Sequence, residues 1–194
     1  MKIKLFSVFI LSFILFFSCE SKVDNKSIST TDVVGVTERS PEEIENFKKY
    51  APEFTFESID GKKVNLKDFK GKYVYVDVWA TWCRPCLEQL PAMKEMEEKY
   101  RDTDIEFLSI SVDKERDKEK WQRMVKNQDM KGVQLYAGGS STFHRDYQIK
   151  TIPRFLLIGK DGELLNDNAP RPMDYRTRGL NGELVEIFDQ LLNY

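Results

Sequence analysis

Two cysteines, Cys83 and Cys86, lie two residues apart in the segment Trp82-Cys83-Arg84-Pro85-Cys86. The segment follows the run Tyr73–Trp79, whose β-branched and aromatic residues predict a buried strand. Apolar residues at helical spacing after Cys86 predict a helix, so Cys83 lies where a strand meets a helix. Unpaired N–H groups and the helix dipole favour an anion there, and the thiolate is the reactive form of cysteine. The pair can therefore close a small disulfide and reopen it, which is dithiol–disulfide exchange.

The same two cysteines also fit a structural disulfide or half of a metal site. Zinc takes at least three protein ligands. Apart from Cys19, only His144 remains to join the pair, so we favour redox chemistry and expect no metal. A lone histidine such as His144 is most simply a surface residue or one already hydrogen-bonded.

Composition sets the broad class of the protein. The 194 residues carry 30 basic and 32 acidic side chains, a net charge of −2, which gives no reason to expect a nucleic-acid partner. Apolar residues make up 41% and aromatic residues 12%, enough for a core. Three cysteines are too few for a small domain held together by disulfides.

The N-terminus reads as an export signal. Residues 1–4 are basic, and Leu5–Phe17 is an apolar run shorter than the roughly 20 residues that a membrane span needs. The run ends in Ser18-Cys19 and then turns polar, which resembles the lipobox of bacterial lipoproteins, whose cysteine becomes the lipidated first residue. We therefore predict a lipoprotein signal peptide over 1–18 and a flexible tether over 19–40. An ordinary cleaved signal peptide with an incidental cysteine is the alternative. Either leads outside the cytoplasm, where disulfides persist.

Residues 41–194 are expected to form one domain. Its first predicted elements are a short helix from Ser40 and a hairpin over 54–66. After the Cys83–Cys86 segment and its helix come a strand over 105–112, a charged helix within 113–131, a strand then loop over 132–139 and a short helix over 142–147. A strand over 151–158 then turns at 160–162 into a second hairpin, and a loop over 168–178 leads to a helix from Asn181. Strands alternating with helices predict an α/β layer fold with one mixed sheet.

Two segments together resemble the active site of the thioredoxin fold: Asp77 to Cys86, and Thr151-Ile152-Pro153. The segments Ala51–Phe54, Asp60–Lys62 and Gly71-Lys72, with the long stretch 104–150, are similar to the TlpA/ResA-like envelope thioredoxins. The resemblance covers about residues 45 to 194. It implies a thioredoxin-like fold: a mixed central sheet flanked by helices, with an N-terminal β-hairpin and an insert typical of that group.

The resemblance also implies roles for four residues. Cys83 would be the exposed attacking thiol, and Cys86 the resolving thiol that closes the disulfide. Asp77 would be a buried acid beneath Cys86 that takes and returns a proton. Pro153 would be a cis-proline facing the disulfide, with Ile152 offering backbone groups to a substrate chain. An Asp at a strand edge and a plain trans-proline are the bland alternatives.

Further residues would shape substrate binding. Trp82 would shield the disulfide and offer a stacking surface, and Pro85 would stiffen the loop. Arg84 would place a positive charge near the thiolate and so favour the reduced form. Many TlpA/ResA-like proteins carry Glu three residues after the second cysteine, where this chain has Gln89, so that acid's role is not carried over.

The favoured function is a lipid-anchored enzyme of the cell envelope, on the periplasmic side of the inner membrane or in the outer membrane, that reduces protein disulfides. Electrons would come from a membrane donor, because no nucleotide or flavin motif occurs and no cofactor is expected. Apocytochrome c for haem attachment is one possible substrate.

Two other functions remain to be distinguished. Thiol peroxidases of this fold resemble Pro-x-x-x-Thr-x-x-Cys, but Val76 and Ala80 occupy those positions here. A copper chaperone would use Cys83, Cys86 and His144, although such chaperones usually separate the cysteines by three residues.

Overall fold

Seven strands form one mixed sheet in a computed structural model that describes residues 49–193. The strand order is β2-β1-β5-β4-β3-β6-β7. Strands β3, β4 and β5 run parallel, and every other neighbouring pair is antiparallel. The thioredoxin-like α/β fold is thus confirmed. The predicted leader 1–18, the tether 19–40 and the helix from Ser40 lie outside the described residues.

The elements follow one another along the chain as sequence periodicity predicted, with few exceptions. The strands are β1 (Thr55–Ser58), β2 (Lys63–Asn65), β3 (Tyr73–Trp79), β4 (Ile105–Ser111), β5 (Val133–Tyr136), β6 (Arg154–Ile158) and β7 (Leu164–Asn166). The α-helices are α2 (Arg84–Leu87), α3 (Leu90–Lys99), α4 (Lys118–Asn127), α5 (Ser141–Asp146) and α6 (Gly182–Leu192). Two short 3-10 helices, η1 (Leu66–Phe69) and η2 (Glu115–Asp117), complete the list.

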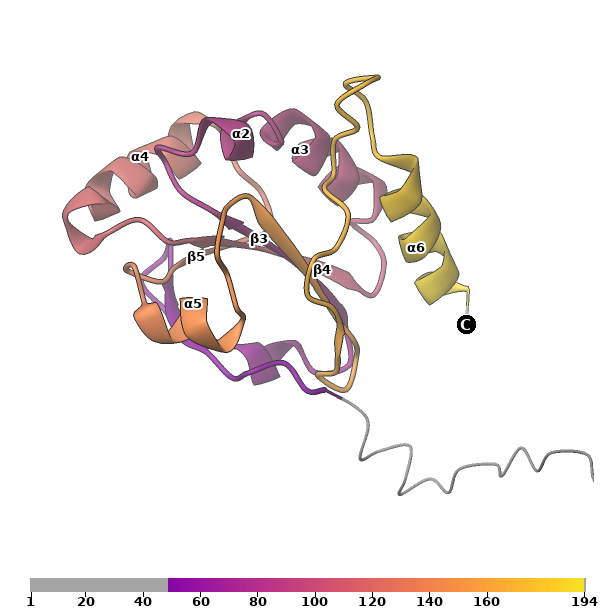
Figure 1. Cartoon of the computed structure of the whole chain (residues 1–194), viewed down its shortest axis with the longest axis horizontal. Helices are drawn as coiled ribbons and strands as arrows, with labels where there is room; N and C mark the ends of the chain where they lie inside the picture. Colours follow the sequence, from indigo (N-terminus) through magenta and orange to yellow (C-terminus); the bar gives the residue numbers. More distant parts are fainter. Residues whose placement is uncertain (1–48, 194) are drawn as a thin grey trace, which may run out of the picture. The chain divides into compact units, whose positions relative to one another are not determined.

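Strand β3 lies between β4 and β6 near the middle of the sheet (Figure 1). Successive side chains of a strand point to opposite faces. Val74, Val76 and Val78 therefore share one face, and Tyr75 and Asp77 share the other. Strand β3 pairs on both edges and is covered on both faces, so its positions favour apolar side chains. Asp77 is the exception.

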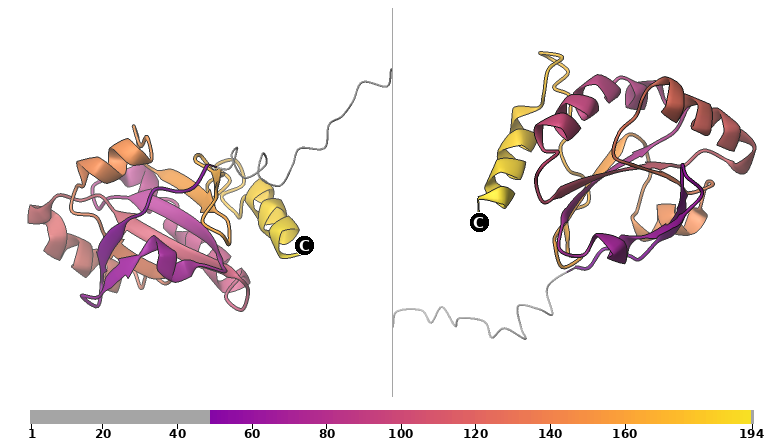
Figure 2. Two further views of the ribbon diagram at one scale, coloured as in Figure 1. Left: turned by 90° about the horizontal axis from the view of Figure 1, so that it is seen from below. Right: turned by 180° about the vertical axis from the view of Figure 1, so that it is seen from behind.

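Helices cover both faces of the sheet, with α2, α3 and α4 on one side and α5 on the other (Figure 1). Helix α6 lies beside α3 in both figures (Figures 1 and 2). Its Phe188 is fully buried and packs edge-on against Tyr75 at 5.3 Å, Tyr100 at 5.1 Å and Phe107 at 5.9 Å between ring centroids. The last helix thus closes the aromatic cluster on the face of the sheet that carries Asp77.

The N-terminal hairpin and the insert join the central sheet. Strands β1 and β2 turn at Gly61, which has a positive φ of 77° that a residue with a side chain rarely adopts. Strand β1 then pairs with β5, so that Glu57 lies opposite Tyr136. The insert thereby supplies an additional parallel strand and the helices α4 and α5, and the hairpin extends the sheet beyond it.

Two predicted boundaries were wrong, at the helix after Cys86 and at the start of β6. The helix after Cys86 is broken into α2 and α3, because Pro91 lies in the first turn of α3 and has no N–H to continue α2. The charged helix predicted within 113–131 is confirmed as α4, which spans 118–127. Strand β6 begins at Arg154 rather than at Thr151, after a cis peptide bond.

Over residues 49–193, no helix combines the length and hydropathy needed to cross a membrane.

We expect Phe188→Ala to lower the free energy of unfolding by about 3–5 kcal/mol, because it leaves a cavity among Tyr75, Tyr100 and Phe107. Urea denaturation of the soluble protein measures this loss. On the exposed side of the same helix, Gln190→Ala is the matched control and should cost less than about 0.5 kcal/mol. Equal losses for the two variants would contradict a core role for α6.

Candidate active site

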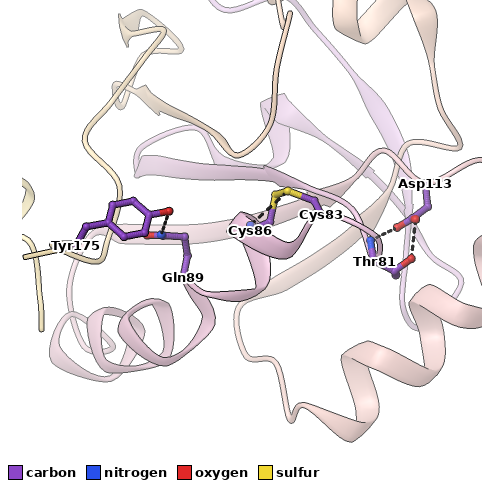
Figure 3. Close-up of a disulfide and its surroundings, with 6 residues drawn as sticks. All are labelled: Thr81, Cys83, Cys86, Gln89, Asp113 and Tyr175. Carbon is purple, nitrogen blue, oxygen red and sulfur yellow. Dashed lines mark hydrogen bonds between the residues drawn. A yellow bond between two sulfur atoms is a disulfide. The ribbon is translucent and has the colours of Figure 1, made fainter. Parts of the chain in front are cut away.

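Cys83 and Cys86 form a disulfide with their Cα atoms 5.3 Å apart (Figure 3). Cys83 is the N-cap residue of α2, and its Sγ accepts a hydrogen bond of 3.3 Å from the backbone N–H of Cys86. A hydrogen bond to the charged form of a group lowers its pKa. When the disulfide is reduced, the same N–H can stabilise a thiolate on Cys83.

The predicted exposure of Cys83 was wrong for the disulfide form. Cys83 is 4% exposed and Cys86 is 1% exposed, so both belong to the buried apolar core. The S–S bond holds the sulfur of Cys83 against its buried partner. In addition, α2 has only four residues, so its helix dipole is small. The N–H of Cys86 therefore contributes more than the dipole to stabilising a thiolate on Cys83.

The loop before Cys83 is anchored by a buried carboxylate, Asp113, which sequence reasoning missed. Its Oδ2 accepts the backbone N–H of Thr81 at 2.9 Å, and its Oδ1 accepts the Thr81 hydroxyl at 2.8 Å (Figure 3). The hydroxyl of Ser111 donates to the same carboxylate at 2.7 Å. Because hydrogen bonds to a buried charge are strong, this clamp ties the active-site loop to the end of β4.

Residues predicted to bind substrate lie at the rim of the disulfide. Trp82 is 64% exposed, and with Ile152 it lines an open groove of about 490 Å³. The other lining residues are Val112, Lys114, Gly139, His144, Ile149, Lys150 and Thr151. We call this hollow the Trp82 groove. It combines an apolar floor with basic groups at its edge.

Arg84 and Pro85 are exposed in the first turn of α2. The guanidinium of Arg84 pairs with Glu88 at 3.5 Å, and its side chain is 90% exposed. Solvent screening and the neighbouring carboxylate weaken its field at the sulfur, so the effect expected of Arg84 on the thiolate is small.

The peptide bond between Ile152 and Pro153 is cis. Ile152 lines the Trp82 groove, whereas Pro153 lines a second hollow of about 350 Å³ together with Met173 and Tyr175. The Ile152–Pro153 peptide therefore lies between the two hollows: Ile152 lines the first and Pro153 lines the second.

Gln89 anchors the loop that lines this second hollow. It is 1% exposed, accepts the backbone N–H of Met173 at 3.2 Å, and donates to the hydroxyl of Tyr175 at 3.2 Å (Figure 3). Arg171 stacks over the ring of Tyr175 at 4.9 Å. The sequence pointed to the position of Gln89 but not to its partners, which lie more than 80 residues away along the chain.

Asp77 is 2% exposed, and its Oδ1 has no hydrogen-bond partner within residues 49–193. Burial, and to a lesser extent the carboxylate of Glu97, raises the pKa of Asp77 to about 8. A carboxyl with this pKa holds a proton at neutral pH and releases it just above. Sequence reasoning did not single out Glu97, which lies on α3 among other charged residues.

In the part of the chain that is described, His, Cys, Asp and Glu side chains form no group of three suited to a metal ion. The structure thus does not bring His144 together with Cys83 and Cys86 as a ligand set.

Comparison with known proteins identifies the family. The AhpC/TSA family matches residues 47–166, which is more than half of the chain. The thiol-disulfide oxidoreductase ResA of Bacillus cereus (strain ATCC 10987 / NRS 248) is 36% identical over 129 residues, covering 66% of this chain and 72% of ResA. The chain belongs to the AhpC/TSA family, among its ResA-like thiol-disulfide oxidoreductases. The TlpA/ResA-like resemblance is confirmed.

Solved structures agree with this family. The ResA-like chain is 46% identical to a candidate thiol-disulfide oxidoreductase of Bacteroides vulgatus, with a TM-score of 0.64 and coverage of 75% of this chain and 90% of the other. A thiol-disulfide oxidoreductase of Bacteroides fragilis NCTC 9343 is 26% identical, with a TM-score of 0.62 and coverage of 74% and 100%.

The raised pKa of Asp77 makes stability depend on pH. Between about pH 4 and pH 8 the folded protein binds a proton at Asp77 that the unfolded chain has lost. Stability from this residue is therefore complete below pH 4 and is lost as the pH rises, by at most about 1.4 kcal/mol per pH unit. Asp77→Asn should be more stable than the wild type at pH 8, by on the order of 2–5 kcal/mol.

Guanidinium denaturation of the oxidised protein at pH 4, 6 and 8 measures the difference. The advantage of Asp77→Asn should be smallest at pH 4 and largest at pH 8. Asp60→Asn, at an exposed position in the hairpin turn, is the control and should show no such trend. An advantage that does not change with pH would contradict the pKa assignment.

Proposed function

We propose that Cys83 attacks disulfides of proteins outside the cytoplasm and that Cys86 completes their reduction. The thiolate of Cys83 attacks one substrate sulfur, the substrate S–S bond breaks, and a mixed disulfide forms. Cys86 then loses its proton and attacks Sγ of Cys83, which releases the second substrate thiolate. The substrate gains two electrons, and the enzyme ends as the Cys83–Cys86 disulfide.

The Cys83–Cys86 disulfide at the start of α2 carries this proposal. Cys83 has the N–H of Cys86 beside its sulfur, and it is the more exposed of the two. Both features favour Cys83 as the attacking thiol, since a nucleophile must be ionised and reachable. Cys86 is only 1% exposed, which suits a resolving thiol that attacks Sγ of Cys83 from the buried side.

Asp77 is the proposed base and acid for Cys86. A buried carboxyl with a pKa of about 8 lies near the pKa of an ordinary thiol, so a proton can pass either way at little cost. The position of Asp77 on β3, six residues before Cys83, matches the buried acid of the thioredoxin fold.

The Trp82 groove is the proposed seat of the substrate chain. An extended peptide could add alongside Ile152 and Pro153, with its backbone paired to the chain at Ile152 and an apolar side chain against Trp82. Arg84 and Pro85 on the exposed turn of α2 would contact the same chain. Lys114 and Lys150 at the groove favour an acidic residue in that substrate.

We propose an envelope location with a lipid anchor at Cys19. The ResA-like family and the lipobox-like leader support an extracytoplasmic protein. The oxidised enzyme must regain two electrons, and a membrane-bound thiol donor is the proposed source. Apocytochrome c is one candidate substrate.

The AhpC/TSA name also covers thiol peroxidases, which are the second candidate. Peroxidases of this fold activate peroxide with a Thr hydroxyl where this chain has Ala80, and keep Pro where it has Val76; both side chains are fully buried. A copper chaperone predicts one tightly bound ion on the reduced protein, whereas the redox function predicts none.

Insulin reduction by the soluble protein with dithiothreitol tests the function. The wild type should accelerate precipitation of the insulin B chain, and Cys83→Ser should abolish the acceleration. Cys86→Ser should accumulate mixed disulfides with envelope proteins, because the resolving thiol is gone.

The double variant Cys83→Ser/Cys86→Ser is the control and should trap nothing. Trapping by Cys83→Ser as efficient as by Cys86→Ser would reverse the assigned roles. No turnover by the wild type together with no trapped protein would remove the proposal, and rapid consumption of peroxide would favour the peroxidase.

We expect Cys19→Ala to release the full-length protein from membranes into the soluble envelope fraction, because the acylated residue is missing. Fractionation followed by immunoblotting measures this, with Ser18→Ala as the control that keeps the cysteine. Membrane retention of Cys19→Ala would contradict the lipid anchor.

A further inference from the structure

A row of polar side chains crosses the otherwise apolar centre of the sheet. Asp77 of β3 pairs in register with Ser109 of β4, which pairs with Gln134 of β5. They are 2%, 2% and 3% exposed. Residues paired in register point to the same face of a sheet. The row therefore leads from Asp77 across two strands, on the face covered by α3.

Beneath α3 this row borders a small space, which we call the polar cavity. It has room for about 10 Å³ of water-sized volume and is lined by Glu97, Ser109 and Gln134, with Lys94, Lys131 and apolar groups around them. That volume is at the lower limit for one water molecule, and the site offers the two to four polar partners that a water needs.

Three buried oxygen atoms have no hydrogen-bond partner in the described part of the chain: Oε2 of Glu97 and Oε1 of Gln134, whose residues line the cavity, and Oδ1 of Asp77, which is paired in register with the lining residue Ser109. Buried oxygens without partners are costly and therefore uncommon in native proteins. A water molecule in the cavity would serve the oxygens of Glu97 and Gln134, and Asp77 is the next residue along the polar row, beside Ser109.

Glu97 connects this interior to solvent. It lines the polar cavity and also an outer groove of about 370 Å³, whose wall includes Lys94, Arg101 and Lys131. Gly132 makes room for its carboxylate, since a Cβ there would lie 2.9 Å from Oε1 of Glu97 and 2.7 Å from the carbonyl oxygen of Phe107. One carboxyl group thus reaches both the buried row and the surface.

We propose that Glu97, through one water molecule in the polar cavity, carries the proton of Asp77 to and from solvent. This deepens the proposed function and rests on it. Cys86 gives its proton to the Asp77 carboxylate; Asp77 passes a proton to the water, which gives one to Glu97; and Glu97 releases it to the outer groove. Re-reduction runs the same transfers backwards. No electrons move along this path, and Glu97 acts through Asp77 rather than on the sulfur atoms.

The electrostatics of the two carboxyls suit such a transfer. Burial raises the pKa of Glu97 to about 7, within about one unit of Asp77, so neither group traps the proton. Lys94 on α3 and Lys131 before β5 oppose this rise at Glu97. Tyr75 on β3 faces the same layer and donates its hydroxyl to the carbonyl of Pro170. Lys72, Glu98, Arg101 and Glu106 lie only at the outer groove.

The test follows the resolving step in isolation. Reduced enzyme reacts with an aromatic disulfide reagent that releases one coloured thiolate when Cys83 attacks and a second when Cys86 resolves. Stopped-flow absorbance then gives two phases, measured from pH 5 to pH 9. Glu97→Gln should leave the first phase unchanged and slow the second about 10-fold, less than the 10²–10⁴-fold of a missing general base. Its pH midpoint should move down, because the negative charge beside Asp77 is gone.

Matched variants separate a relay from a structural effect. Glu95→Gln makes the same charge change at an exposed site on the same helix and should match the wild type in both phases. Glu97→Asp keeps a carboxyl and should recover part of the second phase. In an Asp77→Asn background, Glu97→Gln should slow the second phase no further, because the two residues act in series.

A second phase for Glu97→Gln equal to that of the wild type, or an independent slowing in the Asp77→Asn background, would overturn the relay. A wild type that shows neither phase would instead refute the proposed function. An unchanged first phase in Glu97→Gln shows that the variant is folded.

Discussion

Both active-site cysteines of this enzyme are buried and almost excluded from water, and this burial determines what the rest of the active site must provide. A buried thiolate is costly unless a donor faces it, and the N–H of Cys86 faces Cys83. A buried thiol cannot give its proton to bulk water, so a group inside the core must take it. In the proposed mechanism that group is Asp77, a buried carboxyl in β3 among mostly apolar side chains.

A carboxyl buried there lowers the stability of the protein, and the close packing of the other side chains of the strand compensates for this loss. Aromatic rings from β4, β6 and α6 surround the neighbouring Tyr75. The polar row from Asp77 towards Gln134 is confined to one layer under α3. The hydrophobic core on both faces confines these polar groups to a narrow row, and in the proposed relay this favours directed proton transfer over general entry of water.

Two anchors hold the loops on either side of the disulfide. Asp113 binds Thr81 before the first cysteine, and Gln89 binds Met173 and the hydroxyl of Tyr175 after the second. The first is a set of hydrogen bonds to a buried carboxyl within the thioredoxin core, and the second ties α3 to the loop that precedes α6. Between these anchors lies the short helix α2, whose exposed side chains are available to contact a substrate. The loops behind the sulfur atoms are thus held in place, whereas the exposed turn in front of them is less constrained.

Local chemistry in the chain was enough to predict the strand before Cys83, both hairpins and the pair Cys83 and Cys86, because periodicity, turn residues and cysteine spacing act over a few neighbours. Asp77 and Pro153 needed the family resemblance as well. The roles of Glu97 and Asp113 and the partners of Gln89 could not be found in this way, because each is a common polar residue whose contacts are made with residues distant along the chain. Their burial and the closure of Cys83 from solvent arise only when strands and helices pack, because desolvation depends on neighbours in space rather than in sequence.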